Sequence, residues 1–98
     1  MEELTLKKNK FLRQFEALVD NELIAIEFVE QERKTFLTKM IISDHLIEKG
    51  YKDKFIALVL DQLKEDEIKV VPTCKEVKSF MRGNKLKYAD LLPVGIAL

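Results

Sequence analysis

Apolar and polar residues alternate with a period of two through much of the first half of the chain. Residues 14–19 and 24–29 both show this pattern, which predicts two half-buried strands. Asp20-Asn21 separates them and favours a turn, because both side chains can hydrogen-bond to nearby backbone. A shorter strand is possible around residues 4–8. Consecutive strands with short links predict an antiparallel meander.

A further strand is predicted over residues 36–42, after a charged connection at residues 31–34. Strict alternation would place two sets of side chains on opposite faces of that strand. One set is Phe36, Thr38, Met40 and Ile42, and the other is Leu37, Lys39 and Ile41.

The period changes in the second half of the chain. Residues 51–64 carry apolar side chains at spacings of three and four, which predicts an amphipathic helix. Residues 68–71 are largely β-branched and end at Pro72, consistent with an interior strand. A second helix is predicted from about Cys74 to a stop at Gly83-Asn84, followed by an apolar tail. The stripe on the first helix consists of Phe55, Ile56, Val59, Leu60 and Leu63.

Composition describes a globular chain and adds little chemistry. Apolar residues make up 47% and charged residues 35%, so we expect one domain over residues 1–98. The single Cys74 excludes an intramolecular disulfide, and no second ligand cluster suggests a metal site. The acidic start and the lack of a long uncharged run predict a cytoplasmic protein with no membrane span.

Charge is balanced, with 17 basic and 17 acidic residues. Bulk charge therefore gives no support for nucleic-acid binding. The distribution is uneven, because residues 69–87 contain six basic residues and only one acidic residue, Glu76. A polyanion-binding module is a weaker alternative on that ground, and a solvated face is the simpler interpretation.

The most specific motif is the run Ile68-Lys69-Val70-Val71-Pro72-Thr73-Cys74, continued by Val77, Phe80 and Tyr88-Ala89-Asp90-Leu91-Leu92. It resembles the ending of very short GNAT-superfamily proteins, the YjdJ-type acetyltransferases. The predicted meander also sits where that family places its strands. The resemblance implies an α+β, GNAT-like mixed sheet of about five strands with two helices.

The resemblance also implies acetyl-CoA as cofactor and an amine as acceptor. In that family the fourth and fifth strands separate, and pantetheine enters the gap. Here those strands would be 37–42 and 68–71, and the pyrophosphate loop would be 47–52. The implied cofactor-binding residues are Ile41, Ile42, Lys49, Gly50, Tyr51 and Lys52.

Cys74 would line the reactive end as the candidate catalytic residue, near a helix N-terminus that is expected to lower its pKa. The competing interpretation is a small buried hydrophobic residue.

Four positions depart from the family pattern. Ile47 stands where Arg or Gln is usual, and Lys52 replaces a small residue. Glu48 adds a negative charge where the family usually has Gly, and Lys39 occupies the place of a histidine on the fourth strand. An inactive domain that binds a protein partner, or binds CoA weakly, is therefore an alternative. A homodimer is also possible, through the edge of the first strand or the apolar tail at 91–98.

Overall fold

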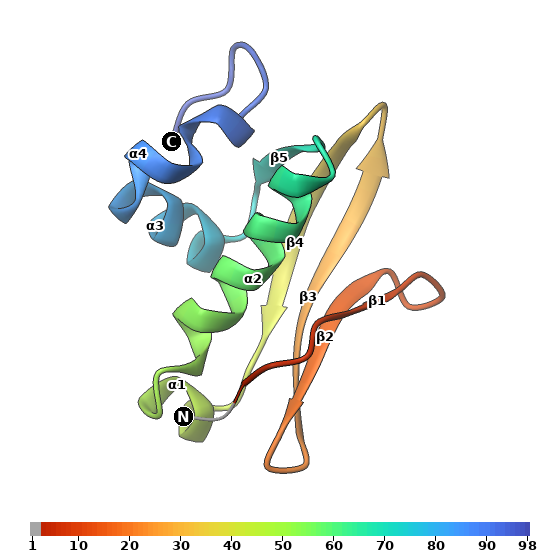
Figure 1. Cartoon of the computed structure of the whole chain (residues 1–98), viewed down its shortest axis with the longest axis vertical. Coiled ribbons are helices and arrows are strands. Elements are labelled where there is room, and N and C mark those ends of the chain that lie inside the picture. The colour runs from red at the N-terminus through yellow and green to blue at the C-terminus, as the bar shows by residue number, and fades with distance from the viewer. Residues whose placement is uncertain (1–2) are drawn as a thin grey trace.

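A five-stranded sheet carries its helices largely on one side (Figure 1). The computed structural model describes residues 3–98. Strands follow one another across the sheet in the order β1-β2-β3-β4-β5, antiparallel except for the parallel pair β4–β5. The elements are β1 (Lys7–Asn9), β2 (Gln14–Val19), β3 (Glu22–Gln31), β4 (Lys34–Ile41), α1 (Asp44–Glu48), α2 (Tyr51–Glu65), β5 (Lys69–Pro72), α3 (Lys75–Gly83), α4 (Lys85–Tyr88) and a 3₁₀ turn, η1 (Ala89–Leu91).

The predicted meander is confirmed, and its turns are tight. Asp20 and Asn21 have φ angles of 52° and 64°, and Glu32 and Arg33 have 50° and 64°. Positive φ at both central residues is the pattern of two-residue hairpin turns, whose twist matches that of the flanking strands. Because the second turn needs only two residues, β3 and β4 are longer than the sequence pattern indicates.

The hydrophobic core lies between the sheet and α2. The predicted helical stripe is confirmed, since each of its five side chains is at most 1% exposed. It meets a sheet face formed by alternate residues of the strands, as the period of two requires. That face includes Phe15, Ala17, Val19, Ile24, Ile26, Phe28, Leu37 and Met40.

The faces predicted for the fourth strand are wrong beyond Leu37. The register passes from Phe28↔Leu37 to Glu27↔Lys39, so Thr38 is an extra residue that forms a β-bulge. The bulge lets both Leu37 and Met40 face the core, three positions apart. Thr38 and Lys39 are both exposed. A period-two pattern cannot anticipate such an insertion, because only the pairing with β3 creates it.

Two further expectations need correction. Four helices occur between residues 3 and 98 rather than two, because short α1 and α4 flank the long ones. Ser43 caps α1 by accepting a hydrogen bond from the Leu46 N–H. Asn84 ends α3 as predicted, yet α4 begins directly after it. Strand β5 is an edge strand rather than an interior one.

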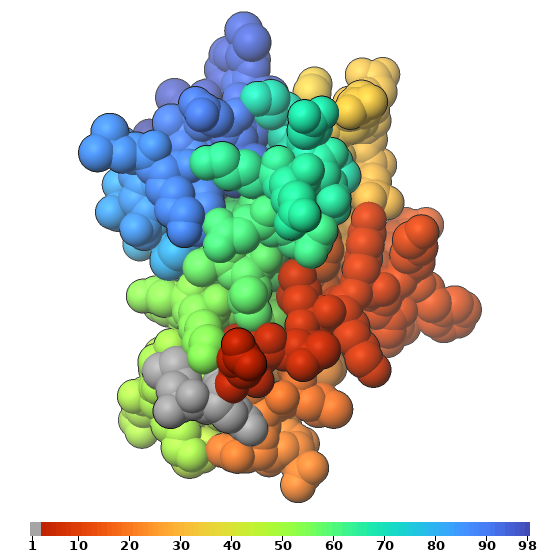
Figure 2. All heavy atoms as spheres, in the orientation of Figure 1, coloured from red at the N-terminus to blue at the C-terminus, as the bar shows by residue number. Residues whose placement is uncertain are grey.

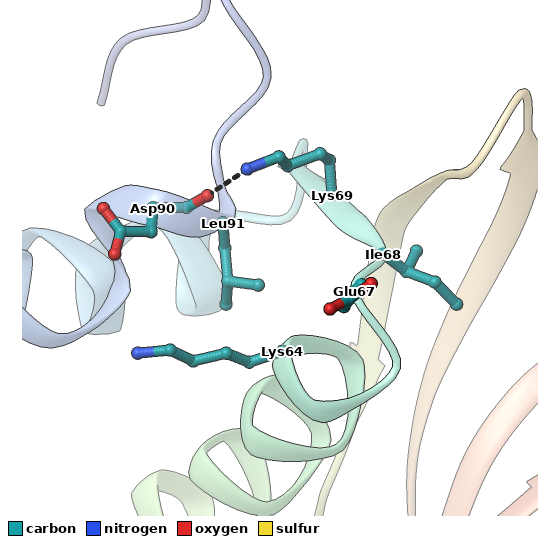
Figure 3. Close-up of a pocket in the computed structure, with 6 residues that line it drawn as sticks. All are labelled: Lys64, Glu67, Ile68, Lys69, Asp90 and Leu91. Carbon is teal, nitrogen blue, oxygen red and sulfur yellow. Dashed lines mark hydrogen bonds between the residues drawn. The ribbon is translucent and has the colours of Figure 1, made fainter.

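The C-terminal tail is tied to the edge strand β5 and to the end of α2. Lys69 donates a hydrogen bond to the carbonyl of Asp90, and Lys64 donates one to the carbonyl of Lys87. Figure 3 shows Lys64 and Lys69 on either side of the hollow that Leu91 enters.

Within residues 3–98, no helix combines the length and apolar character that a membrane span needs.

Tyr88 anchors this tail through its hydroxyl. Its side chain is 1% exposed, and the hydroxyl donates a hydrogen bond to Asp61 Oδ1 at 2.9 Å. The acceptor, Asp61, lies on α2 and is itself about half exposed, so the hydrogen bond is only partly buried. Burial, together with the hydrogen bond to Asp61, raises the pKa of Tyr88.

We expect Tyr88→Phe to lower the free energy of unfolding by about 1 kcal/mol at neutral pH, because one partly buried hydrogen bond is lost. The raised pKa stabilises the fold fully below the usual tyrosine pKa near 10, and this stabilisation is lost as the pH rises through the folded-state value. Urea denaturation at neutral and alkaline pH should show a smaller alkaline loss in Tyr88→Phe than in the wild type. An equal alkaline loss in both proteins would contradict the assignment.

Candidate functional site

Strands β4 and β5 part after only four residue pairs. They pair from Lys34↔Lys69 to Leu37↔Pro72 and no further. The carbonyl of Leu37 closes the ladder by accepting hydrogen bonds from the backbone N–H of Thr73 at 3.2 Å and of Cys74 at 2.9 Å, and from the Thr73 hydroxyl at 2.9 Å. Beyond this point the chain turns into α3.

This parting leaves one edge of β4 open. Residues 39–41 still pair with β3, but no other strand in the described part of the chain lies on their second edge. The bulge at Thr38 stands at the start of this segment, and its hydroxyl donates to the carbonyl of Glu27 at 3.2 Å. A bulge bends a strand, so it helps to carry residues 38–41 away from the line of β5. Ile41 is 38% exposed, whereas Ile42 packs partly against the core.

Helix α2 begins two residues after the short helix α1, which itself follows β4. Gly50 is its N-cap residue, with φ 88°, and no side chain caps the helix there. A helix start leaves backbone N–H groups without intrahelical partners and carries partial positive charge. Tyr51 is buried and Lys52 half-buried, while Glu48 is exposed just before the helix.

Lys49 is held by a residue from another part of the chain. Its ammonium lies 3.1 Å from Asp20 Oδ2, in the β2–β3 turn. This hydrogen bond and the charge of Asp20 raise the pKa of Lys49. The ion pair is exposed, so solvent screens it and it can open at little cost.

Cys74 lies at the start of α3 and its thiol is buried. The side chain is 4% exposed, and Sγ lies 3.2 Å from Oε1 of Glu76. Burial, and then the hydrogen bond and negative charge of Glu76, raise the pKa of the thiol. The predicted lowering is wrong. The backbone N–H groups of Glu76 and Val77 do act to lower the pKa, but burial outweighs them.

Glu76 is a residue of this site that the sequence interpretation missed. Burial tends to raise its carboxyl pKa, but the hydrogen bond from Cys74, its own backbone N–H and the charges of Lys75 and Lys52 bring it below the usual value. Helices α2 and α3 are in contact, so the charge of Lys52 near the start of α2 can act on this carboxyl. The sequence shows a charged residue two positions after Cys74. Only the backbone conformation at the start of α3, however, brings its carboxylate to the thiol.

We expect Cys74 to react slowly with iodoacetamide at neutral pH, because a buried thiol with a raised pKa holds little thiolate. Glu76→Gln should speed the reaction at a fixed alkaline pH, since the negative charge that opposes ionisation is gone. Glu48→Gln makes the same charge change on the neighbouring helix α1 and should have no such effect. Wild-type alkylation at the rate of the urea-unfolded chain would refute this account.

Two further ionisable side chains, Lys39 and His45, lie apart from this group. Lys39 is exposed on the sheet face opposite α2, directly across from Glu27 in the register. His45, the only histidine of the chain, is exposed on α1.

The structure therefore brings together an open edge of β4, an uncapped start of α2 and the start of α3 with Cys74 and Glu76. A family model described as GCN5-related N-acetyl-transferase matches residues 14–91, from β2 to η1. No curated protein matches the sequence significantly. The match spans the open β4 edge and both helix starts, and the chain belongs to the GCN5-related N-acetyltransferase family.

Proposed function

We propose that this domain transfers an acetyl group from acetyl-CoA to an amine. The observation that supports this most directly is the early parting of β4 from β5 at Leu37 and Pro72, beside the start of α2. An unpaired strand edge can hydrogen-bond an extended amide chain such as pantetheine. Family membership makes acetyl transfer the expected class of reaction.

The residues present fit such a cofactor. In the proposal, the backbone of Ile41 and Ile42 at the open edge receives the pantetheine. The start of α2, at Gly50, Tyr51 and Lys52, receives the pyrophosphate, because the helix dipole favours negative charge there. Gly50 already has the positive φ that lets backbone approach a ligand closely.

Two side chains near the start of α2 affect the proposed binding of the pyrophosphate. Lys49 would have to leave Asp20 in order to reach the pyrophosphate, and the exposure of that pair makes the exchange inexpensive. Glu48 is exposed beside the same loop and adds a repulsive charge. We therefore propose weaker cofactor binding than a loop with small neutral residues would provide.

Acetyl-CoA, when bound, supplies an activated thioester. Cys74 would line its reactive end as a neutral hydrogen-bonding thiol, because its raised pKa disfavours a nucleophilic thiolate. The chain's part in the reaction is then to hold the thioester against the open edge of β4, and to admit an amine to it. Direct attack by the amine requires no covalent intermediate on the protein.

A second candidate is a family member that no longer catalyses transfer. The observation that favours it is Lys39 at the position where a histidine is expected, together with Glu48 in the loop. Such a domain would keep the fold and bind a protein partner, or CoA weakly. It predicts cofactor binding without turnover, or no binding.

A thermal-shift titration with acetyl-CoA separates these possibilities first. A ligand that binds only the folded state stabilises it, so the melting temperature should rise with concentration. Gly50→Ala should reduce the shift, because a Cβ at φ 88° strains the backbone where the pyrophosphate would approach. Gly95→Ala is the matched control, since Gly95 has the same φ and open space around it. No shift at millimolar acetyl-CoA would exclude cofactor binding.

Release of CoA, followed with a thiol reagent in the presence of small amines and lysine peptides, then tests turnover. Loss of turnover in Cys74→Ala with the thermal shift preserved would assign Cys74 a chemical role. Unchanged turnover would restrict Cys74 to lining the site. Binding with no turnover for any amine would favour the second candidate.

A further inference from the structure

The turn between β1 and β2 exposes apolar and basic side chains together. We name residues 10–13, Lys10-Phe11-Leu12-Arg13, the β1–β2 turn. Phe11 is 93% exposed and Leu12 is 56% exposed, although both are large apolar residues. Figures 1 and 2 show the turn projecting from the side of the molecule away from the helices. Exposure of two adjacent large apolar side chains to water is energetically unfavourable. A partner surface that covered them would remove this cost.

This turn is an ordered structure. The side chain of Asn9 accepts a hydrogen bond from the Leu12 N–H at 2.9 Å. Arg13 takes a left-handed conformation with φ 55°, and its carbonyl accepts a hydrogen bond from the Phe28 N–H at 2.9 Å. The backbone is thus fixed at both ends, and Phe11 and Leu12 are held outward by it rather than folded back.

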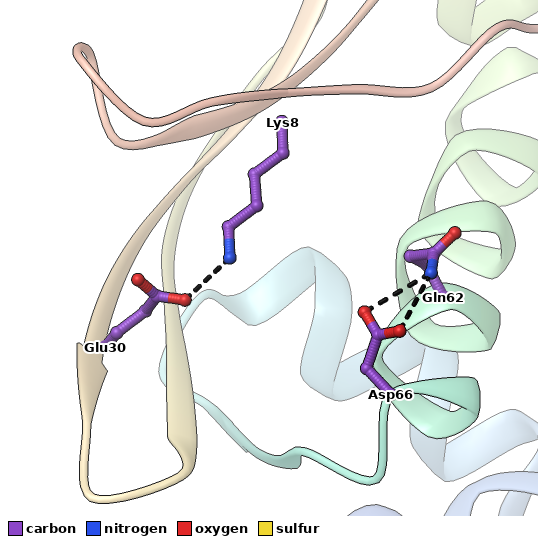
Figure 4. Close-up of polar contacts among 4 residues, drawn as sticks. All are labelled: Lys8, Glu30, Gln62 and Asp66. Carbon is purple, nitrogen blue, oxygen red and sulfur yellow. Dashed lines mark hydrogen bonds and ion pairs between the residues drawn. The ribbon is translucent and has the colours of Figure 1, made fainter.

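The cations of the turn are available to a ligand. Neither Lys10 nor Arg13 makes a side-chain hydrogen bond or ion pair with any residue from 3 to 98. Lys8 behaves differently, because its ammonium lies 2.7 Å from Glu30 (Figure 4). Because Glu30 is paired with Lys8, the positive charge of Lys8 largely offsets the negative charge of Glu30 near the β1–β2 turn.

A hollow of about 340 Å³ adjoins these cations. Its lining consists of Lys10, Arg13, Phe28, Val29 and Glu30. Val29 is itself 47% exposed, so the hollow has an apolar wall next to its two positive ones. A phosphodiester with an attached apolar group matches that combination of charge and surface.

From this arrangement we propose that the β1–β2 turn docks onto an anionic membrane surface. Lys10 and Arg13 hold a lipid phosphate at the hollow, and Phe11 and Leu12 enter the boundary between headgroups and acyl chains. A surface that combines cations with aromatic and aliphatic residues is typical of interfacial binding, and each cation adds attraction to anionic lipid. Nucleic acid fits less well, because Phe11 is the one aromatic side chain of the turn and Leu12 beside it offers no face on which a second base could stack.

Cosedimentation with vesicles tests the proposal. The probes are vesicles of phosphatidylcholine alone and of phosphatidylcholine mixed with phosphatidylglycerol. We expect the full chain to sediment with the mixed vesicles and not with those of phosphatidylcholine alone. High salt should dissociate the protein from the mixed vesicles, because salt screens the attraction between charges. Lys10→Gln with Arg13→Gln should weaken binding roughly 30-fold, since each cation near the surface contributes about one kilocalorie per mole. Phe11→Ser with Leu12→Ser should weaken binding by more than about tenfold.

Val94→Ser is the control for the apolar pair, because Val94 is fully exposed at the other end of the chain and should not affect binding. The variants should remain folded, since the replaced side chains are exposed; circular dichroism checks this. Unchanged vesicle binding in Phe11→Ser/Leu12→Ser would overturn the proposal. It would equally fall if wild-type protein ignored mixed vesicles but bound single-stranded RNA through Lys10 and Arg13.

Discussion

Phe55→Ala is expected to remove about 3–5 kcal/mol from the free energy of unfolding. Phe55 is 0% exposed and is the largest side chain of the α2 stripe, so its loss leaves a cavity in the core. A domain of this size has a total stability of about 5–15 kcal/mol, so the variant should be marginal or unfolded. Urea denaturation, followed by circular dichroism, measures the change directly.

Leu86→Ala is the matched control for Phe55→Ala. Leu86 is fully exposed on α4, and its truncation should change the free energy of unfolding by no more than about 0.5 kcal/mol. A loss of less than about 1 kcal/mol in Phe55→Ala would mean that the core does not depend on α2 in the manner described.

Deletion of Thr38 is expected to abolish the stabilisation by acetyl-CoA while leaving the protein folded. With Thr38 removed, Phe28↔Leu37 and Glu27↔Lys39 become neighbouring pairs of a regular ladder. Leu37 and Met40 then face the core by ordinary alternation, so the hydrophobic contacts survive. The bend that helps to open the β4 edge is lost with the bulge.

The size of this effect follows from mass action. At a hundred times its dissociation constant, a ligand stabilises the folded state by about 2.7 kcal/mol. For a domain of this length, that corresponds to a rise in melting temperature of roughly 10 °C or more. Wild-type protein should show the rise and the deletion variant should not.

Thr38→Ala provides the control for the deletion. It removes the hydroxyl that donates to Glu27 but keeps the extra residue, so the bulge and the ligand-induced rise should persist. If the deletion variant responds to acetyl-CoA as the wild type does, the bulge has no part in cofactor binding. If it fails to fold, the register argument itself is wrong.

The sequence alone predicted most of the elements. Alternation over residues 14–19 and 24–29, and the stripe from Phe55 to Leu63, match buried faces of the structure. These patterns are local, because the hydrophobic effect sorts side chains by their position in a period of two or of 3.6. Gly50 at the start of α2 was similarly recognisable, since few other residues take a positive φ without strain.

The candidate site depended on contacts between distant segments. The bulge at Thr38 exists only because β3 fixes the register on both sides of it. The carbonyl of Leu37 ends the β4–β5 ladder because Thr73 and Cys74 return to it from 36 or more positions along the chain. Cys74 shows the same limit, since a helix start suggested a lowered pKa, and burial in the assembled core raises it.

What the sequence by itself determined is therefore most of the strands and the two longer helices, together with a resemblance that the family match confirms. What only the tertiary structure decided is where β4 leaves β5, which residues of β4 face the core, and how the Cys74 thiol is held. The physical reason is the distance along the sequence over which each kind of interaction acts. Propensity and periodicity act within a few residues, whereas register, burial and the electrostatic setting of a buried thiol come from residues far apart in sequence.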